Sequence, residues 1–216
     1  MKTTNIENLA VTLSRSTGLA IAIGLILSGC TNDDGLQPQA HDENVYQQIN
    51  HRMMTEMDKM ADTNDPDHDF AMMMRMHHQG AIDMSNEELK SGDNQTMKQM
   101  AQQVITAQTA EIAQFNQFLQ SHKAVVIPAG ATYNAEEMES MMKMMRAQDV
   151  RVLTGDSDVD YAQLLIDHHQ SALEVAMSEL KYGDDAQIRQ MATKIIDDQK
   201  KEIGMLQDWL KANKNY

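Results

Sequence analysis

The 216-residue chain has little cysteine, proline, glycine, aromatic side chain or positive charge. Its single cysteine, Cys30, excludes an internal disulfide, a paired-cysteine redox motif and a cysteine-based zinc site. Three prolines, ten glycines and 4% aromatic residues are too few for the turns and packed faces of a strand-rich domain. The formal net charge of −14 repels phosphate backbones, so nucleic acid is not an expected partner.

The residues that dominate are alanine, glutamine, methionine, lysine and glutamate, which favour helices. Composition therefore predicts an all-α fold. The chain contains neither a GxSxG nucleophile elbow nor a GxxxxGK[ST] phosphate loop. We therefore do not expect an enzyme.

The N-terminal segment has the pattern of an export signal. Two basic residues, Lys2 and Arg15, precede an apolar run at residues 18–27. As a helix this run spans only about 15 Å, which is too short to cross a membrane. The run ends in Leu-Ser-Gly-Cys at 27–30, which resembles a bacterial lipobox and implies cleavage before Cys30 and a lipid on its sulfur. The alternative is an ordinary signal peptide with an incidental cysteine.

On the first interpretation, residues 1–29 are a lipoprotein signal peptide and the polar residues 30–42 are a flexible tether. The mature protein is then exported and held at the membrane, facing the periplasm or the cell surface. The lipid on Cys30 is the only expected membrane contact, since no other segment is apolar enough to span.

The rest of the chain is a duplication with a 91-residue period. Residues 69–119 and 160–210 share 19 identities over 51 ungapped positions, more than chance produces. We predict a first repeat at 43–122, a linker at 123–134 and a second repeat at 135–212, both in one bundle.

Each repeat is predicted to hold three helices. A short helix covers about 43–61 and 135–148, a long one runs from the Asp65-Pro66 cap to Ser91 and over 158–182, and a third covers 94–121 and 185–212. The Gly-Asp pairs at 92–93 and 183–184 end one helix and cap the next. Two long hairpins predict an antiparallel four-helix bundle with two short accessory helices.

Polar residues fall on the apolar faces of these helices. At 100° per residue His77 shares a stripe with Met74 and Met84, and His78 lies at its edge. Glu111 lies inside the apolar stripe of the following helix, where a carboxylate is costly unless it is paired or binds a metal. The hairpin turn brings these groups to one level along the bundle. The second repeat offers the same arrangement.

Two interpretations of this pattern stay open. In one, Glu111 and Glu202 only fix the histidine rings in a buried hydrogen-bond network. In the other they belong to a metal site, with Gln108 and Gln199 as hydrogen-bond partners of the ligands. The candidate metal ligands are Met74, His77, His78, Met84, Glu111, His168, His169 and Glu202.

The chain has 20 methionines, and 14 of them lie at residues 53–84 and 138–145. A methionine stripe usually fills a core. The runs at 72–74 and 141–145, however, wrap round a helix beyond one packing face. Thioethers are soft ligands that suit Cu(I). Further candidate ligands are therefore Met53, Met54, Met57, Met141, Met142 and Met145.

The segments DFAMMMRMHHQGAIDMSNEEL and VITAQTAEIAQFNQFL, with their counterparts in the second repeat, resemble the bacterial domain-of-unknown-function family 305. The resemblance covers about residues 43–212. It departs at Ser171 and Val175, where the pattern has glycine and methionine, and this puts a second equivalent site in doubt. The resemblance implies a ferritin-like bundle, the periplasm and, in some members, copper binding.

Together these observations predict an exported lipoprotein that binds or sequesters copper, as Cu(I), through histidine and methionine. One rival is a dinuclear iron or manganese oxidoreductase, although no glutamate stands three residues before a histidine as such sites require. The other rival is a structural or interaction module without metal. A protein partner is not identifiable from the sequence.

Overall fold

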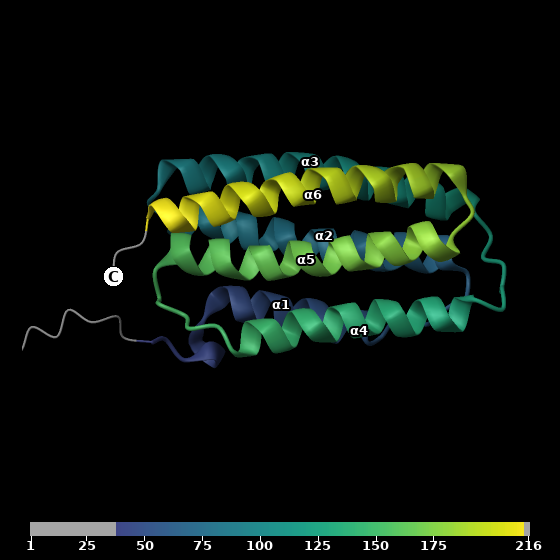
Figure 1. The fold of residues 1–216 in the computed structure, drawn as a ribbon, viewed down its shortest axis with the longest axis horizontal. Helices are drawn as coiled ribbons and strands as arrows, with labels where there is room; N and C mark the ends of the chain where they lie inside the picture. The colour runs from purple at the N-terminus through teal and green to yellow at the C-terminus, as the bar shows by residue number, and fades with distance from the viewer. Residues whose placement is uncertain (1–37, 214–216) are drawn as a thin grey trace, which may run out of the picture. The chain divides into compact units, whose positions relative to one another are not determined.

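The computed structural model describes residues 38–213 (Figure 1). Cys30, the signal peptide and most of the expected tether lie outside this range. Residues 38–213 contain no strand; their elements are η1 (His41–Glu43), α1 (Val45–Met57), α2 (Pro66–Ser91), α3 (Gln95–Ser121), α4 (Gly130–Asp149), α5 (Ser157–Tyr182) and α6 (Ala186–Ala212). The predicted all-α helical bundle is confirmed. None of the described helices is both long and apolar enough to cross a bilayer.

Side-chain caps fix where most helices begin. The side chains of five residues accept hydrogen bonds from backbone N–H groups in the first turn that follows, and each such cap stabilises a helix by about 1 kcal/mol. These residues are Asn44, Asp65, Asn94, Asp156 and Asp185. Pro66 follows its cap at the first helical position, where its missing N–H costs nothing.

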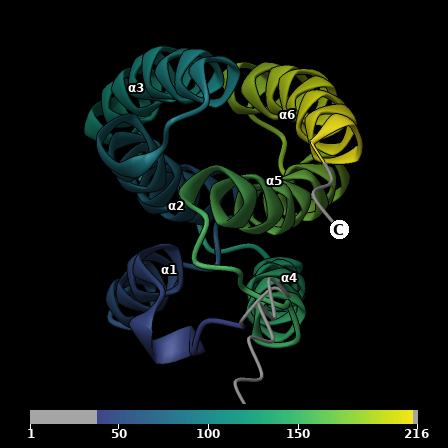
Figure 2. The ribbon, with the colours of Figure 1, turned by 90° about the vertical axis from the view of Figure 1, so that its left-hand side faces the viewer.

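The helices are arranged in layers, as the end view in Figure 2 shows. The long helices α2 and α5 lie side by side in the middle, and α3 and α6 cover one face of them. On the opposite face α1 packs against α2 and α4 packs against α5. The histidine-bearing helices α2 and α5 are therefore covered on both faces.

The turn of each hairpin is closed by the first turn of the other hairpin. Asp158 of α5 accepts hydrogen bonds from the backbone N–H groups of Asp93 and Asn94, at 3.2 Å and 3.1 Å. In the other half Asp67 of α2 accepts from the N–H groups of Asp184 and Asp185, at 3.1 Å and 3.0 Å. These reciprocal contacts place α2 and α5 antiparallel.

The structure differs from the sequence-based prediction at the helix that opens the second repeat. This helix, α4, begins at Gly130 rather than near residue 135, because Tyr133 is fully buried and draws its turn into the core. Gly130 packs against the backbone of Asn64, where a Cβ atom would collide. With 20 residues, α4 is longer than a short accessory helix.

The end of the segment expected to be a tether is also folded. The backbone N–H of Gln39 donates to the Leu153 carbonyl at 2.7 Å, and His41 Nε2 lies 2.9 Å from the Arg151 carbonyl oxygen. The short 3-10 helix η1 follows directly. The folded part of the first repeat therefore begins before residue 43.

Candidate metal centre

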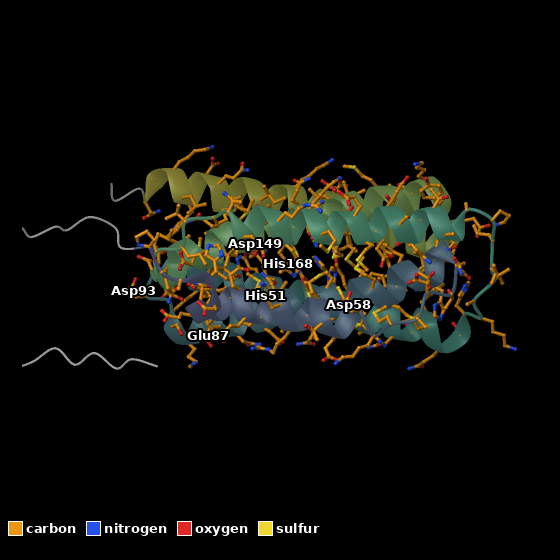
Figure 3. All side chains as sticks on the ribbon, turned by 90° about the horizontal axis from the view of Figure 1, so that it is seen from below. His51, Asp58, Glu87, Asp93, Asp149 and His168 are labelled. Carbon is orange, nitrogen blue, oxygen red and sulfur yellow. The ribbon has the colours of Figure 1, made fainter. Side chains whose placement is uncertain are left out.

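Four histidines meet in the middle of the bundle. His77 and His78 come from α2, His168 and His169 from α5, and all four are fully buried. The ring centroids of His77 and His168 are 3.7 Å apart, and those of His168 and His169 are 6.2 Å apart. Figure 3 shows His168 inside the bundle, about halfway along the helices. The two HH pairs of the repeat thus form one cluster, which we call the histidine cluster.

Only some of the ring nitrogens have partners. His78 Nε2 donates to Glu111 Oε2 at 2.9 Å, and His77 Nε2 lies 2.9 Å from Ser171 Oγ. His169 Nε2 is 2.9 Å from Glu202 Oε2 but lacks hydrogen-bond geometry. In the described part of the chain the Nδ1 atoms of all four histidines and Nε2 of His168 have no partner. Buried polar atoms are rarely left in this state unless a ligand or water meets them.

Burial keeps two of the rings neutral. The pKa of His77 lies well below its usual value because burial disfavours the charged ring, and His78 and His169 add to this effect. The pKa of His168 is lowered in the same way, by burial first and then by His77 and His169. A neutral imidazole keeps one lone pair free, which is the form that binds metal ions.

Glu111 is tied to two partners. Burial raises its pKa, but hydrogen bonds from His78 and Lys194 outweigh burial and hold the pKa below its usual value. Lys194 Nζ, from α6, lies 2.8 Å from Glu111 Oε1 and links the two hairpins. Glu202 is less buried, with a side chain 21% exposed. The carboxylate of the first repeat therefore already has its charge compensated.

The predicted glutamines are both buried. Gln108 has neither side-chain amide atom hydrogen-bonded within residues 38–213, and Gln199 lacks a partner for Oε1 there. Within residues 38–213 these amide atoms make no hydrogen bond to the histidine cluster, so no contact supports the predicted role. They remain buried polar groups on the inner faces of α3 and α6.

The predicted methionines are distributed unevenly. Met74 and Met84 are fully buried but belong to two separate apolar clusters. Met142 is 41% exposed, so it does not face the core. The other candidates are buried or partly buried in the cluster that holds Met74, namely Met53, Met54, Met57, Met141 and Met145.

Sulfur nevertheless reaches the histidine cluster from α1 and α4. Ser171 Oγ, which contacts His77, also lies 3.4 Å from Met144 Sδ. Met53 Sδ and His168 Nε2 lie 2.5 Å and 3.2 Å from the position that a Cβ atom on Gly80 would take. The contacts of Met144 and Ser171 are absent from the sequence-based assignment. The repeat could have indicated them, since Met144 aligns with Met53 and Ser171 with Gly80.

In residues 38–213 no three His, Cys, Asp or Glu side chains are grouped so that they could hold a metal ion. The donors that do come together are imidazole nitrogen and thioether sulfur. These are the ligand types that soft cations such as Cu(I) prefer.

Two buried carboxyl groups near the ends of the bundle also escaped sequence reasoning. Burial, with the nearby Asp158, raises the pKa of Glu88 to about 8. Burial, with the nearby Asp67, raises the pKa of Glu179 to about 10. Both glutamates are fully buried, and they occupy the space that a side chain at Gly92 or Gly183 would need. Both are therefore protonated at neutral pH.

The fold and the centre define a class, that of helical-bundle proteins with a buried cluster of histidines between duplicated hairpins. The family described as Domain of unknown function (DUF305) matches residues 67–210, and the chain belongs to this family. No curated protein and no solved structure matches the chain.

Proposed function

We propose that the protein is an exported, lipid-anchored metal-binding protein that holds Cu(I) through buried histidine and methionine side chains. The observation that carries the proposal is the set of buried ring nitrogens without partners next to thioether sulfur. Such nitrogens cost free energy in the absence of a ligand, and a bound soft cation would remove that cost. Copper binding here means buffering or sequestration, with no catalytic step.

The residues of the cluster fit a soft cation better than a hard one. His78 and Lys194 already hold Glu111, so this carboxylate is not free to bridge two metal ions. The neutral rings of His77 and His168 offer nitrogen donors, and Met53 offers sulfur beside His168. This donor set favours copper over the iron or manganese of a dinuclear oxidoreductase.

The location of the protein is part of the same proposal. The Leu-Ser-Gly-Cys run at residues 27–30 supports lipid attachment at Cys30, outside the cytoplasm. A Cys30→Ser variant should move from the membrane fraction to the soluble fraction. If it stays in the membrane to the same extent as the wild type, the anchor lies elsewhere.

Copper binding is tested by titrating Cu(I), under anaerobic reducing conditions, against a chromogenic chelator. A His77→Phe/His168→Phe variant should bind Cu(I) at least about tenfold more weakly, since loss of even supporting groups costs that much. The matched control is His41→Ala/His122→Ala, which removes two histidines outside the cluster. Equal losses in the two variants would contradict the assignment.

A further inference from the structure

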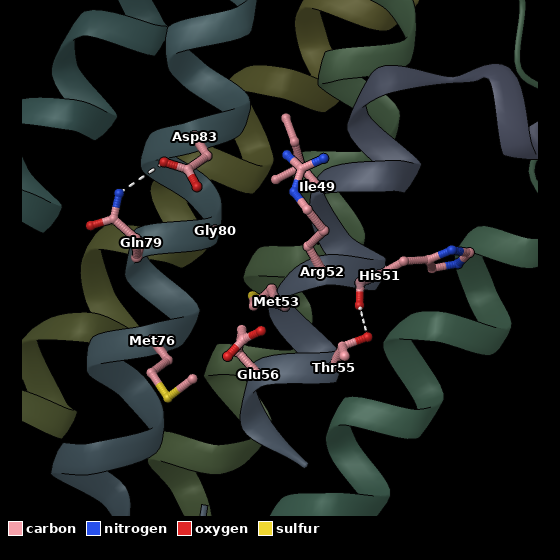
Figure 4. Close-up of a pocket in the computed structure, with 10 residues that line it drawn as sticks. All are labelled: Ile49, His51, Arg52, Met53, Thr55, Glu56, Met76, Gln79, Gly80 and Asp83. Carbon is pink, nitrogen blue, oxygen red and sulfur yellow. Dashed lines mark hydrogen bonds between the residues drawn. The ribbon is translucent and has the colours of Figure 1, made fainter. Parts of the chain in front are cut away.

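The repeat has produced two pockets that occupy equivalent places but differ in size. One pocket, between α1 and α2, has a volume of about 470 Å³ and is lined by Arg52, Met53, Met76 and Gly80, among others (Figure 4). Its counterpart between α4 and α5 has about 120 Å³ and is lined by the equivalent residues Lys143, Met144, Asp167 and Ser171. We call them the Gly80 pocket and the Ser171 pocket.

Gly80, which lines this pocket, also lies against the histidine cluster. Met53 Sδ and His168 Nε2 lie 2.5 Å and 3.2 Å from the position that a Cβ atom on Gly80 would take, so both atoms approach this helix only because residue 80 has no side chain. His168 is fully buried, and neither of its ring nitrogens has a hydrogen-bond partner in the described residues. A glycine at such a position permits close approach of a ligand. A soft sulfur donor, Met53 Sδ, and a nitrogen without a partner, His168 Nε2, therefore both lie next to Gly80.

In the Ser171 pocket the same space is filled. Ser171 Oγ lies 2.9 Å from His77 Nε2 and 3.4 Å from Met144 Sδ, and it donates to the His168 carbonyl at 2.7 Å. The hydroxyl thus lies between imidazole and thioether, whereas in the other half Gly80 places no side-chain atom between Met53 Sδ and His168 Nε2. It also provides a partner for His77 Nε2, whereas His168 Nε2 has none.

Residues that line the Ser171 pocket are also held in salt bridges. Lys143 Nζ lies 3.1 Å from Glu174 Oε2, and Arg151 binds Asp167 with contacts of 2.9 Å and 2.6 Å. In the Gly80 pocket a thioether, Met76, stands where the other half has Asp167. Figure 4 shows Met76 and Gly80 on α2 and Met53 on the facing helix α1. The lining of the Gly80 pocket therefore contains two thioethers, those of Met53 and Met76.

We propose that the two halves of the centre are functionally unequal: Cu(I) enters through the Gly80 pocket and binds between Met53 Sδ and His168 Nε2, while Ser171 keeps the equivalent place closed. The inference rests on the proposed function and assigns it to one side of the molecule. The duplicated chain then has one such site, not two. The sequence difference that creates the inequality is Gly80 against Ser171.

The test compares matched leucine substitutions in the two pockets. Met53→Leu and Met144→Leu each remove one sulfur at nearly constant volume, so both variants should fold. Cu(I) competition titrations should show a loss of about tenfold or more for Met53→Leu and less than about threefold for Met144→Leu. X-ray absorption of the copper-loaded proteins should show a sulfur neighbour lost only in Met53→Leu.

A second pair of variants exchanges the residues that differ. Gly80→Ser should block the site and lower the Cu(I) affinity, and Ser171→Gly should open the other pocket and raise the stoichiometry from one ion toward two. Thermal unfolding checks that each variant is folded. If Gly80→Ser is not folded, the leucine pair alone decides the question.

The outcomes separate the two proposals. A wild-type protein that does not compete for Cu(I) overturns the proposed function. A wild type that binds Cu(I), but loses it equally in Met53→Leu and Met144→Leu, overturns only the assignment to the Gly80 pocket. A wild type that binds two ions with equal affinity at the cluster also overturns that assignment.

Discussion

Replacing the buried Glu179 by glutamine should stabilise the protein at neutral pH and have little such effect in mild acid. Burial, assisted by Asp67, raises the pKa of Glu179 from 4.5 to about 10 in the folded chain. Between these two values the folded protein keeps a proton that the unfolded chain has lost. The contribution of Glu179 to stability therefore falls as pH rises through this window, and it is largest near or below pH 4.5.

The magnitude follows from the distance between the working pH and the unfolded pKa. At pH 7 the protonated Glu179 costs about 3 kcal/mol of stability, from 2.5 pKa units at 1.36 kcal/mol each, and at pH 5 about 0.7 kcal/mol. Glutamine never ionises and keeps the shape of the protonated acid. The advantage of Glu179→Gln over the wild type should therefore grow by about 2–3 kcal/mol between pH 5 and pH 7.

Denaturation with urea at pH 5, 6 and 7 measures this growth directly. Comparing the variant with the wild type at each pH removes contributions from other titrating groups that do not contact Glu179. In thermal unfolding the same change amounts to roughly 5–10 °C for a chain of this size. Glu87→Gln is the control, because hydrogen bonds from Ser91 and Lys90 lower the pKa of Glu87 and no gain at pH 7 is expected.

A difference between variant and wild type that stays constant from pH 5 to pH 7 would refute the reasoning. It would mean that Glu179 ionises at an ordinary pH in the folded protein, through water that reaches the end of the bundle.

Three further results are expected. Glu111→Gln should lower stability by about 1–3 kcal/mol in denaturant titrations, because a neutral amide replaces the charged partner of both His78 and Lys194. Gly204→Ala should raise the melting temperature by an amount equivalent to about 0.5–1 kcal/mol, since this glycine lies inside α6 and a Cβ there meets nothing within 4 Å. Gly130→Ala should lower the melting temperature, because its Cβ would meet the backbone of Asn64; an unchanged value would show that this loop yields.

Much of the fold was predictable because its signals are local. The Asp65-Pro66 cap and the turns near residues 92 and 183 place the four long helices to within a residue or two. The start of α4 was not predictable, since it depends on Tyr133 reaching a core that only the folded chain has. The contribution of α1 and α4 to the core likewise depends on tertiary packing, which a sequence pattern does not show.

At the centre, helical periodicity places the histidines on inward faces but does not show which side chains they contact. It placed His78 at the edge of an apolar stripe, whereas the structure buries it fully against Glu111. The contact of Glu111 with Lys194 depends on how α3 and α6 approach each other. Spacing alone makes Met142 a candidate ligand, and only the packing of α4 shows that it faces outward.

The reciprocal closure of the hairpin turns bears on how a duplicated chain of this kind could arise. Asp67 and Asp158 each supply acceptors to a turn in the opposite repeat, so two backbone N–H groups of each turn are satisfied by the other repeat. A polypeptide with a single repeat could obtain the same carboxylate acceptors from a second identical molecule. The geometry thus corresponds to a twofold-symmetric homodimer whose subunits became joined by gene fusion. Once both halves lay in one chain, position 80 and position 171 could diverge independently, a freedom that identical subunits do not have.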